Sequence, residues 1–324
     1  MKKVLFGVLL VLFISGIGFA DGAVEEPGSR SNGLTADSPL EIRFVGVFIN
    51  EAFFNPVKKG MEEAADVLNV NAVFTGDEAA DIDHQNALIR QFADEGVDGI
   101  AVDMIDATAY NDAIEYAMNK GVPVVAFNVD ATNGNGPHLA YTQQDFVKAG
   151  AAVAGYVIDD IQSGATVLVT EHDKGVSALD DRAEGIRQVL LKKNINVIET
   201  STTADPVVAT QKILEQLSAH PDIAAILATG QADTEGAGLA VQKSGMDIIV
   251  AGFDISDNIL SLIQEGVISA TTDQQPYMQG FYPVLQLVLY NRYGLTPTDI
   301  DAGAGLVTSE NVSSVISLSA AGYR

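Results

Sequence analysis

The sequence contains no cysteine and no tryptophan. Without cysteine there can be no disulfide bond, no thiolate metal site, and no cysteine after an export signal to carry a lipid anchor. Without tryptophan, an aromatic contact with a ligand must come from phenylalanine or tyrosine. Basic residues are scarce, with 18 Lys and Arg against 43 Asp and Glu and a formal net charge of −25. A surface of this charge repels nucleic acid and anionic lipid, so neither is expected as a partner.

Signature motifs for metal, nucleotide and hydrolase sites are also missing. The four histidines are scattered, and no pair of them has the spacing of metal ligands. There is no GxxxxGK[ST] loop, no GxGxxG after the first apolar run and no GxSxG turn. The polar triplet Glu171-His172-Asp173 is interpreted as a solvated loop. The sequence therefore predicts no metal, no cofactor and no enzymatic activity, with hydrolysis as a weak alternative.

A hydrophobic run long enough to cross a membrane is missing, even at the N-terminus. There a short basic start precedes the apolar run Val4–Phe13 and a small-residue stretch that ends at Ala20. The run falls short of the roughly 20 residues that a membrane span needs, although a membrane anchor is the alternative. We expect a signal peptide over residues 1–20, cleaved near Ala20, and a flexible leader over residues 21–40. An exported chain without a lipidated cysteine is expected to be free in the periplasm.

Short apolar runs alternate with helix-like segments through the rest of the chain. The first run, Ile42–Ile49, precedes an expected helix over Pro56–Leu68, and the pattern then repeats. Continuous apolar strands that alternate with helices are typical of a parallel sheet covered on both faces. The polar tail Asn311–Arg324 is expected to have little order at its end.

One phrase of the sequence occurs twice, 126 positions apart. Val124–Asn128 and Val250–Asp254 each run from apolar residues through a phenylalanine to a polar residue. The offset stays at 125 to 126 through several expected strands. The sequence therefore predicts two similar α/β halves, with Asn128 and Asp254 at the carboxyl ends of corresponding strands, where open α/β sheets bind ligands.

Polar and aromatic residues cluster at these expected strand ends. The carboxylates and amides there could instead cap the next helix or turn. Arg182 lies in the first turn of a helix, where a cation is unfavourable, and a local ion pair is the simpler explanation for it. Phe53 and Phe54 are adjacent aromatic residues, and one of the two is expected to pack into the core. The set comprises Phe53, Phe54, Asp103, Asn128, Arg182, Asp254 and Gln274.

Several of these segments together resemble the periplasmic sugar-binding proteins of the ribose/galactose type, the substrate receptors of carbohydrate ABC transporters. The resemblance rests on Asn50–Phe54, on Arg182 within Ser177–Gly185, and on Gly252–Asp254. It covers residues 42–307. It implies an α/β fold with two Rossmann-like lobes, each with a parallel sheet, joined by a three-stranded hinge in the type I periplasmic binding protein arrangement. The implied N-terminal lobe comprises 41–143 plus 276–306, and the C-terminal lobe 144–275 plus 307–324.

The resemblance also implies a ligand-binding set, with some departures. Val129 stands where ribose binders have an arginine, and the family's asparagine falls on Gly230, so Gln231 is expected to substitute for it. Ribose as the ligand therefore does not follow. The implied set is Glu51, Phe53, Phe54, Asp103, Asn128, Arg182, Gln231, Asp254 and Gln274.

These features predict a monomeric periplasmic receptor that clamps a small neutral sugar or polyol between its lobes. The expected partners are the sugar, the permease of an ABC importer and, as a further candidate, a chemoreceptor. The alternative is a receptor for a non-sugar molecule, such as a signalling molecule or nucleoside, or an exported enzyme on the same scaffold.

Overall fold

The computed structural model describes residues 38–324. The expected signal peptide (1–20) lies outside these residues, and so does the expected leader as far as residue 37. Within the described residues, no helix combines the length and apolar character that a membrane crossing requires.

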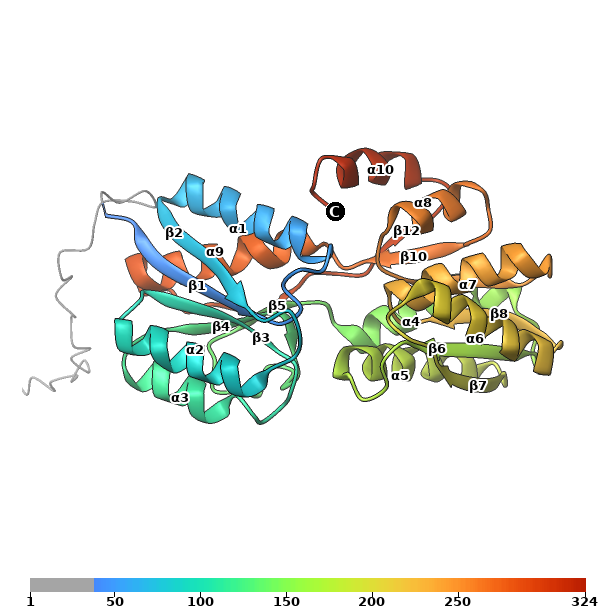
Figure 1. The fold of residues 1–324 in the computed structure, drawn as a ribbon, viewed down its shortest axis with the longest axis horizontal. Helices are drawn as coiled ribbons and strands as arrows, with labels where there is room; N and C mark the ends of the chain where they lie inside the picture. Colours follow the sequence, from blue (N-terminus) through green and yellow to red (C-terminus); the bar gives the residue numbers. More distant parts are fainter. Residues whose placement is uncertain (1–37) are drawn as a thin grey trace, which may run out of the picture. The chain divides into compact units, whose positions relative to one another are not determined.

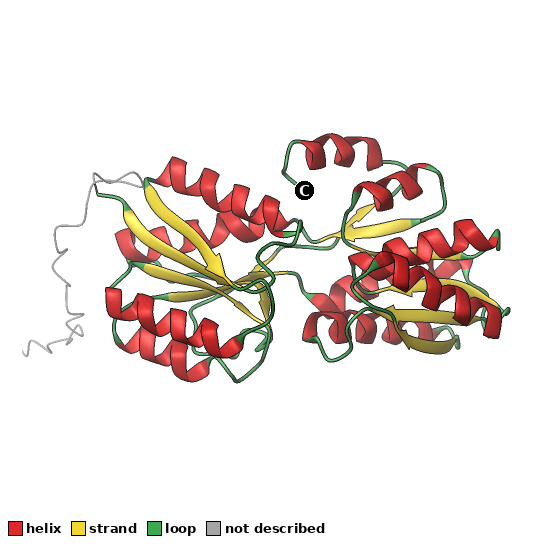
Figure 2. Ribbon diagram, in the orientation of Figure 1, coloured by secondary structure: helices red, strands yellow, loops and turns green. Residues whose placement is uncertain are grey.

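Two six-stranded sheets organise this part of the chain (Figures 1 and 2). The first has the order β11-β5-β4-β3-β1-β2, and all of its pairings are parallel. Helices α1 and α9 cover one face, and α2 and α3 cover the other. Its strands are β1 (Leu40–Gly46), β2 (Val70–Gly76), β3 (Gly99–Met104), β4 (Val124–Asp130), β5 (Tyr141–Gln143) and β11 (Ile300–Asp301). Its helices are α1 (Phe54–Leu68), α2 (Ile82–Glu95), α3 (Asn111–Asn119) and α9 (Pro276–Tyr293).

The second sheet has the corresponding order β12-β10-β9-β8-β6-β7. Helices α4 and α5 cover one face, and α6, α7 and α8 cover the other. Only its outermost pairing, β10 with β12, is antiparallel. Its strands are β6 (Thr166–Glu171), β7 (Asn196–Ser201), β8 (Ile223–Ala228), β9 (Ile249–Phe253), β10 (Ala270–Asp273) and β12 (Gly305–Val307). Its helices are α4 (Phe146–Val157), α5 (Ser177–Lys192), α6 (Pro206–Ala219), α7 (Gln231–Ser244), α8 (Asp257–Gln264) and α10 (Val312–Ala320).

The central strands form because their side chains are apolar on both faces. Every residue of β3 and of β6 is buried, as the continuous apolar runs predict. Several helices begin at side-chain caps: Asp205 accepts hydrogen bonds from the backbone N–H groups of Val207 and Val208 at the start of α6. The predicted α/β fold class with two parallel-stranded sheets is confirmed.

The repeat extends to helix packing. A Cβ on Gly60 of α1 would lie 2.0 Å from the carbonyl oxygen of Tyr277 in α9, and a Cβ on Gly185 of α5 would lie 2.0 Å from that of Val147 in α4. Glycine at both positions therefore allows the same close backbone approach in each half. The two halves therefore share the order of their strands, the constant sequence offset and this close contact between two helices.

Three crossovers connect the sheets, at 143–146, 273–276 and 301–305. Hydrogen bonds join them to one another. Ala302 N–H donates to Gln143 O (2.7 Å), the Gln144 amide to Gly303 O (2.9 Å) and the Gln275 amide to Ala302 O (2.5 Å). The lobe boundary expected between residues 306 and 307 falls inside β12, which pairs with the second sheet.

The C-terminal segment corrects one expectation. The tail expected to have little order at its end forms α10, which packs against α8, and its last residues are also held. The Tyr323 ring packs against that of Tyr277 (centroids 5.3 Å apart), and the Arg324 guanidinium forms an ion pair with buried Asp273. The tail is polar in composition, but its residues Val312 and Val315 are buried and pack α10 against the second sheet's helices.

Candidate ligand-binding site

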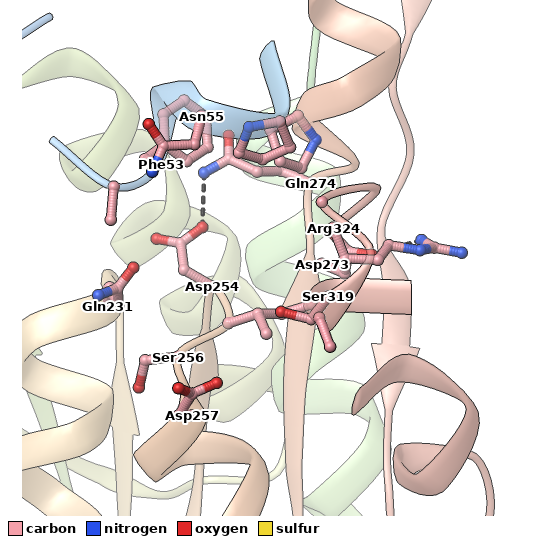
Figure 3. Close-up of a pocket in the computed structure, with 16 residues that line it drawn as sticks. Phe53, Asn55, Gln231, Asp254, Ser256, Asp257, Asp273, Gln274, Ser319 and Arg324 are labelled. Atoms are coloured by element: carbon pink, nitrogen blue, oxygen red, sulfur yellow. Dashed lines mark hydrogen bonds and ion pairs between the residues drawn. The ribbon is translucent and has the colours of Figure 1, made fainter. Parts of the chain in front are cut away.

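A cavity of about 500 Å³ lies where strand ends and loops of both sheets converge. It is lined by eight of the nine residues predicted from the sequence. A neighbouring cavity of about 470 Å³, drawn in Figure 3, shares Phe53, Gln231, Asp254 and Gln274 with it and extends toward the C-terminal residues. The eight residues are Glu51, Phe53, Phe54, Asp103, Asn128, Gln231, Asp254 and Gln274.

Asn128 and Asp254 have the same unusual backbone conformation. Their φ angles are 61° and 68°, in the left-handed region that asparagine and aspartate tolerate better than other non-glycine residues. Asp254 directly follows β9, whereas Asn128 lies within β4, where the pairing of β4 with β3 shifts register, so the expected strand end at Asn128 is corrected. Both residues line the larger cavity. The predicted pairing of these two positions is thus present in the backbone itself.

The Asp254 carboxylate is held from one side. Its Oδ1 accepts a hydrogen bond from the Gln274 amide at 2.5 Å, drawn dashed in Figure 3. Its Oδ2 lies 3.9 Å from Nη1 of Arg182. No donor of the described residues lies within hydrogen-bond distance of Oδ2, so this oxygen can accept a hydrogen bond from a ligand.

Arg182 is the predicted residue that lines neither cavity. It is 3% exposed, and it donates to Gln144 Oε1 (3.0 and 3.2 Å) and to Thr229 O (3.0 Å). Its guanidinium carbon lies 4.3 Å from the centre of the Phe253 ring. Burial lowers the pKa of Arg182, while the charge of Asp254 opposes this. The Arg182 guanidinium thus lies next to the Asp254 carboxylate but outside both cavities. Its direct contact with a ligand stays a prediction.

Asp103 is a fully buried carboxyl group at the end of β3. Its Oδ2 accepts a hydrogen bond from the Asn128 amide at 3.1 Å, and its Oδ1 has no hydrogen-bond partner among residues 38–324. Burial raises the pKa of Asp103 to about 7, against the effect of the Asn128 hydrogen bond. Near neutral pH the group can therefore either donate or accept a hydrogen bond.

The two adjacent phenylalanines have different environments. Phe54, the first residue of α1, is 2% exposed and packs with Phe74 in the core of the first sheet. Phe53 is only partly buried and lines both cavities. The rings contact each other edge to face, with centroids 5.1 Å apart. Of these two, Phe53 is thus the side chain with a face available to a ligand, while Phe54 packs into the core as expected for one of the pair. Phe48, which is 38% exposed, also lines the larger cavity.

Glu51 and Gln231 approach the cavity from opposite sheets. Burial raises the pKa of Glu51, the charge of His172 lowers it, and that of Asp254 raises it. Helix α7 begins at Gln231. Gln231 therefore lies at a helix start that faces both cavities.

His172 also lines the larger cavity, although the sequence pattern was interpreted as a solvated loop. That interpretation is wrong for Glu171 and His172: Glu171 ends β6 and is 3% exposed, and the His172 side chain is 24% exposed. The His172 Nδ1 lies 3.1 Å from Oδ1 of buried Asp233. The sequence offered one indication of this role for His172: position 230 is glycine where the resemblance suggests asparagine, and a residue without a side chain leaves room for a neighbouring ring.

No group of three or more His, Asp or Glu side chains suited to a metal ion occurs in residues 38–324. The larger cavity instead presents the aromatic side chains of Phe48 and Phe53 together with amides and carboxyl groups. Such a set matches a molecule with hydroxyl groups and apolar C–H faces.

Comparisons with known proteins agree with this geometry. A family model described as a periplasmic binding protein domain matches residues 42–292. The ribose import binding protein of Bacillus subtilis is 32% identical over 72% of this chain and 75% of its own length. The xylose/arabinose-binding protein of Sulfolobus acidocaldarius is 27% identical over 93% of this chain and 82% of its own.

Solved structures show the same fold. A carbohydrate transporter protein of Acidothermus cellulolyticus, in complex with myo-inositol, superposes with a TM-score of 0.76 at 27% identity, covering 88% of this chain and all of that one. A periplasmic ribose ABC transporter protein of Conexibacter woesei gives a TM-score of 0.78 at 23% identity, covering 90% and 97%. These relatives are binding proteins and not enzymes, which confirms that prediction. The chain belongs to the periplasmic binding protein family.

Proposed function

We propose that this chain is the receptor of an ABC importer and that it clamps a small neutral sugar or polyol between its two sheets. One observation carries the proposal: side chains from the strand ends of both sheets line one cavity of about 500 Å³. That volume suits a small ligand. The relatives named for ribose, xylose and arabinose support a sugar rather than a nucleoside or signalling molecule.

The chemistry of the lining favours an uncharged ligand. Asp254 Oδ2 can accept a hydrogen bond from a sugar hydroxyl group, Asp103 Oδ1 can accept or donate one, and the amides of Asn128 and Gln231 can donate. Phe53 can stack on the C–H face of a sugar ring. A ligand carboxylate or phosphate in the larger cavity would face Glu51 and Asp254, and no arginine or lysine of residues 38–324 lines that cavity.

Closure of the two lobes about the crossovers would retain the ligand. With β12 assigned to the second sheet, the lobes that we propose comprise 41–143 plus 276–304 and 144–275 plus 305–324, and three short crossovers join them. Hinge closure is a known response of periplasmic binding proteins to ligand. Exclusion of water strengthens the hydrogen bonds made in the closed cavity.

Calorimetry on the ligand-stripped protein tests this function. D-ribose, D-xylose, arabinose and myo-inositol are the first probes, and mass spectrometry of the compound released on denaturation identifies a co-purified ligand. We expect at least one sugar or polyol to bind with 1:1 stoichiometry. If none binds and the released compound is not a carbohydrate, the non-sugar alternative replaces this proposal.

The cellular setting is proposed on the same basis. We propose export by the signal peptide over residues 1–20 and residence in the periplasm, with an importer permease as partner and a chemoreceptor as a second one. N-terminal sequencing of the secreted protein should begin at Asp21, and light scattering should give a monomer. An N-terminus at Met1 in the periplasmic fraction would contradict cleavage.

A further inference from the structure

The strongest feature that the predicted ligand set does not include is the packing of His172 against Gly230. A Cβ on Gly230 would lie 2.4 Å from Cε1 and 2.5 Å from Nδ1 of the His172 ring. Real contacts of that kind do not occur, so the imidazole occupies the space that any other side chain at position 230 would need. The φ of Gly230 is −149°, an extended conformation open to any residue. The backbone therefore does not require glycine here, and the neighbouring ring does.

The imidazole has a defined orientation because its partner can only accept. Asp233 is fully buried, and its carboxylate accepts hydrogen bonds from Thr229 N–H (2.9 Å), Gly230 N–H (3.1 Å) and Thr170 Oγ1 (2.8 Å). Its Oδ1 also faces His172 Nδ1 at 3.1 Å. The carboxylate is surrounded by donors, so Nδ1 carries a proton and donates as well.

The second ring nitrogen has no partner among residues 38–324. The Nδ1–Cε1 edge lies against Gly230 and Asp233, and the ring lines the 500 Å³ cavity. The free Nε2 of His172 accepts a hydrogen bond when the ring is neutral and donates one when it is protonated. Four groups act on its charge: Asp233 of α7, Asp254 after β9, Arg182 of α5, and Glu51 of the first half.

We infer that His172, oriented by Asp233 and accommodated by Gly230, is an additional ligand-contacting residue that selects a hydroxyl group of a neutral sugar or polyol through Nε2. This inference rests on the proposed function and deepens it. Glycine at position 230 and histidine at position 172 form one unit: loss of a side chain at the first position makes room for the ring at the second.

The charge of the ring gives the contact a pH dependence. Burial lowers the pKa of His172, but the hydrogen bond to Asp233 and the charges of Asp233 and Asp254 outweigh burial, so the pKa lies above its usual value. A protonated ring donates to a hydroxyl oxygen with the strength of a charge-assisted hydrogen bond. Affinity for the sugar is therefore highest below this pKa and falls as the pH rises through it.

A double-mutant cycle tests the unit, using whichever of D-ribose, D-xylose, arabinose and myo-inositol binds the wild type most tightly. His172→Ala should weaken binding about 10- to 100-fold, the usual range for a hydrogen bond to a charged group. Gly230→Ala should have a similar effect, because its methyl group displaces the ring. In the His172→Ala background, Gly230→Ala should change affinity less than about twofold.

Two controls separate contact from general damage. His172→Gln keeps a hydrogen-bond donor but cannot titrate, so its affinity for the sugar should not show the decrease with rising pH that His172 causes in the wild type. His84 lines neither cavity, so His84→Gln should show the same decrease as the wild type. Melting temperatures of all variants report on folding. Sugar binding that is unchanged in His172→Ala, or additive effects in the cycle, would overturn the inference alone. A wild type that binds none of the four compounds would overturn the proposed function and the inference with it.

Discussion

The two halves of this chain share a backbone plan and differ in chemistry. Corresponding strands occupy corresponding places in the two sheets, and Asn128 and Asp254 have nearly the same φ. The first half places the aromatic residues Phe53 and Phe54 beside its strand ends, together with the carboxyl groups of Glu51 and Asp103. The second half places there the charged group of Arg182, Asp233 and His172, and Asp254 itself.

Both halves offer hydrogen-bonding groups to a ligand, the first half offers the aromatic face as well, and the second half carries the buried arginine. An aromatic face contacts the apolar side of a sugar ring, and charged side chains form directional hydrogen bonds with hydroxyl groups. A duplicated scaffold with identical strand ends would offer the same contacts to both sides of a ligand. Divergence at the strand ends allows the cavity to bind an asymmetric molecule while the packing of each sheet is retained.

The largest expected effect concerns the two phenylalanines of the first half. Phe54→Ala removes a buried ring and should lower the free energy of unfolding by about 3–5 kcal/mol. Phe53→Ala should cost clearly less stability but weaken sugar binding. Denaturant unfolding and calorimetry on both variants separate the effects, and the reverse assignment would follow if Phe54→Ala stayed stable and lost binding.

Asp103 should make stability depend on pH in a way that its counterpart Thr229 cannot. The pKa of Asp103 is raised to about 7, so between its unfolded value near 4 and about 7 the folded state holds a proton that the unfolded chain has released. Its contribution to stability is therefore lost as the pH rises. At about 1.4 kcal/mol per pKa unit the loss is of the order of a few kcal/mol.

Asp103→Asn removes this loss. Its stability relative to wild type should increase from pH 4 to pH 7 and then level off, in urea unfolding at each pH. Thr229→Val, which deletes the buried hydroxyl that donates to Thr170 O, should cost about 1 kcal/mol at every pH. A pH-independent difference for Asp103→Asn would show that this carboxyl is not protonated in the folded state.

The paired strand-end residues should contribute unequally to binding. Asp254→Ala should weaken sugar binding by about 2 kcal/mol or more, because Gln274 and Arg182 then lose a buried partner. Arg182→Ala should have a similar effect. Asn128→Ala should cost about 1 kcal/mol, since only a neutral amide is lost. Calorimetry checks the order, with Asp257→Ala, which lines only the smaller cavity, as the control. Equal losses at positions 128 and 254 would contradict the assigned difference.

Gly60 and Gly185 should respond alike, because they occupy equivalent helix contacts. Alanine at either position places a methyl group 2.0 Å from a carbonyl oxygen of the adjoining helix, so the helices must separate, at a cost of about 1–3 kcal/mol. Gly155→Ala is the matched control, since nothing lies within 4 Å of its Cβ position. It should stabilise α4 by about 0.5–1 kcal/mol. Calorimetric melting distinguishes these outcomes, and a melting temperature unchanged by Gly60→Ala would argue against the close contact.

Much of this molecule follows from local sequence. The apolar run before Asp254 and its repeat before Asn128 predict buried parallel strands, because only a strand covered on both faces suits so continuous a pattern. The constant offset predicts two equivalent halves. Segment composition was less informative at the C-terminus, where Val312 and Val315 bury one face of α10 within a polar stretch.

Tertiary structure alone decided how the strand-end residues divide their roles. Arg182 and Asp254 are both polar residues in the sequence, yet Asp254 lines both cavities and Arg182 is buried next to it, 3.9 Å away. Phe53 and Phe54 are the same residue type, and the start of α1 directs the Phe54 ring into the core and leaves the Phe53 ring at the cavity. His172 joins the cavity because Gly230, 58 positions later in the sequence, leaves room for its ring. The order of apolar and polar residues determined the two sheets and their strand ends, because burial follows hydrophobic pattern. Roles within the cavity depend on contacts between distant segments, and no local pattern encodes these.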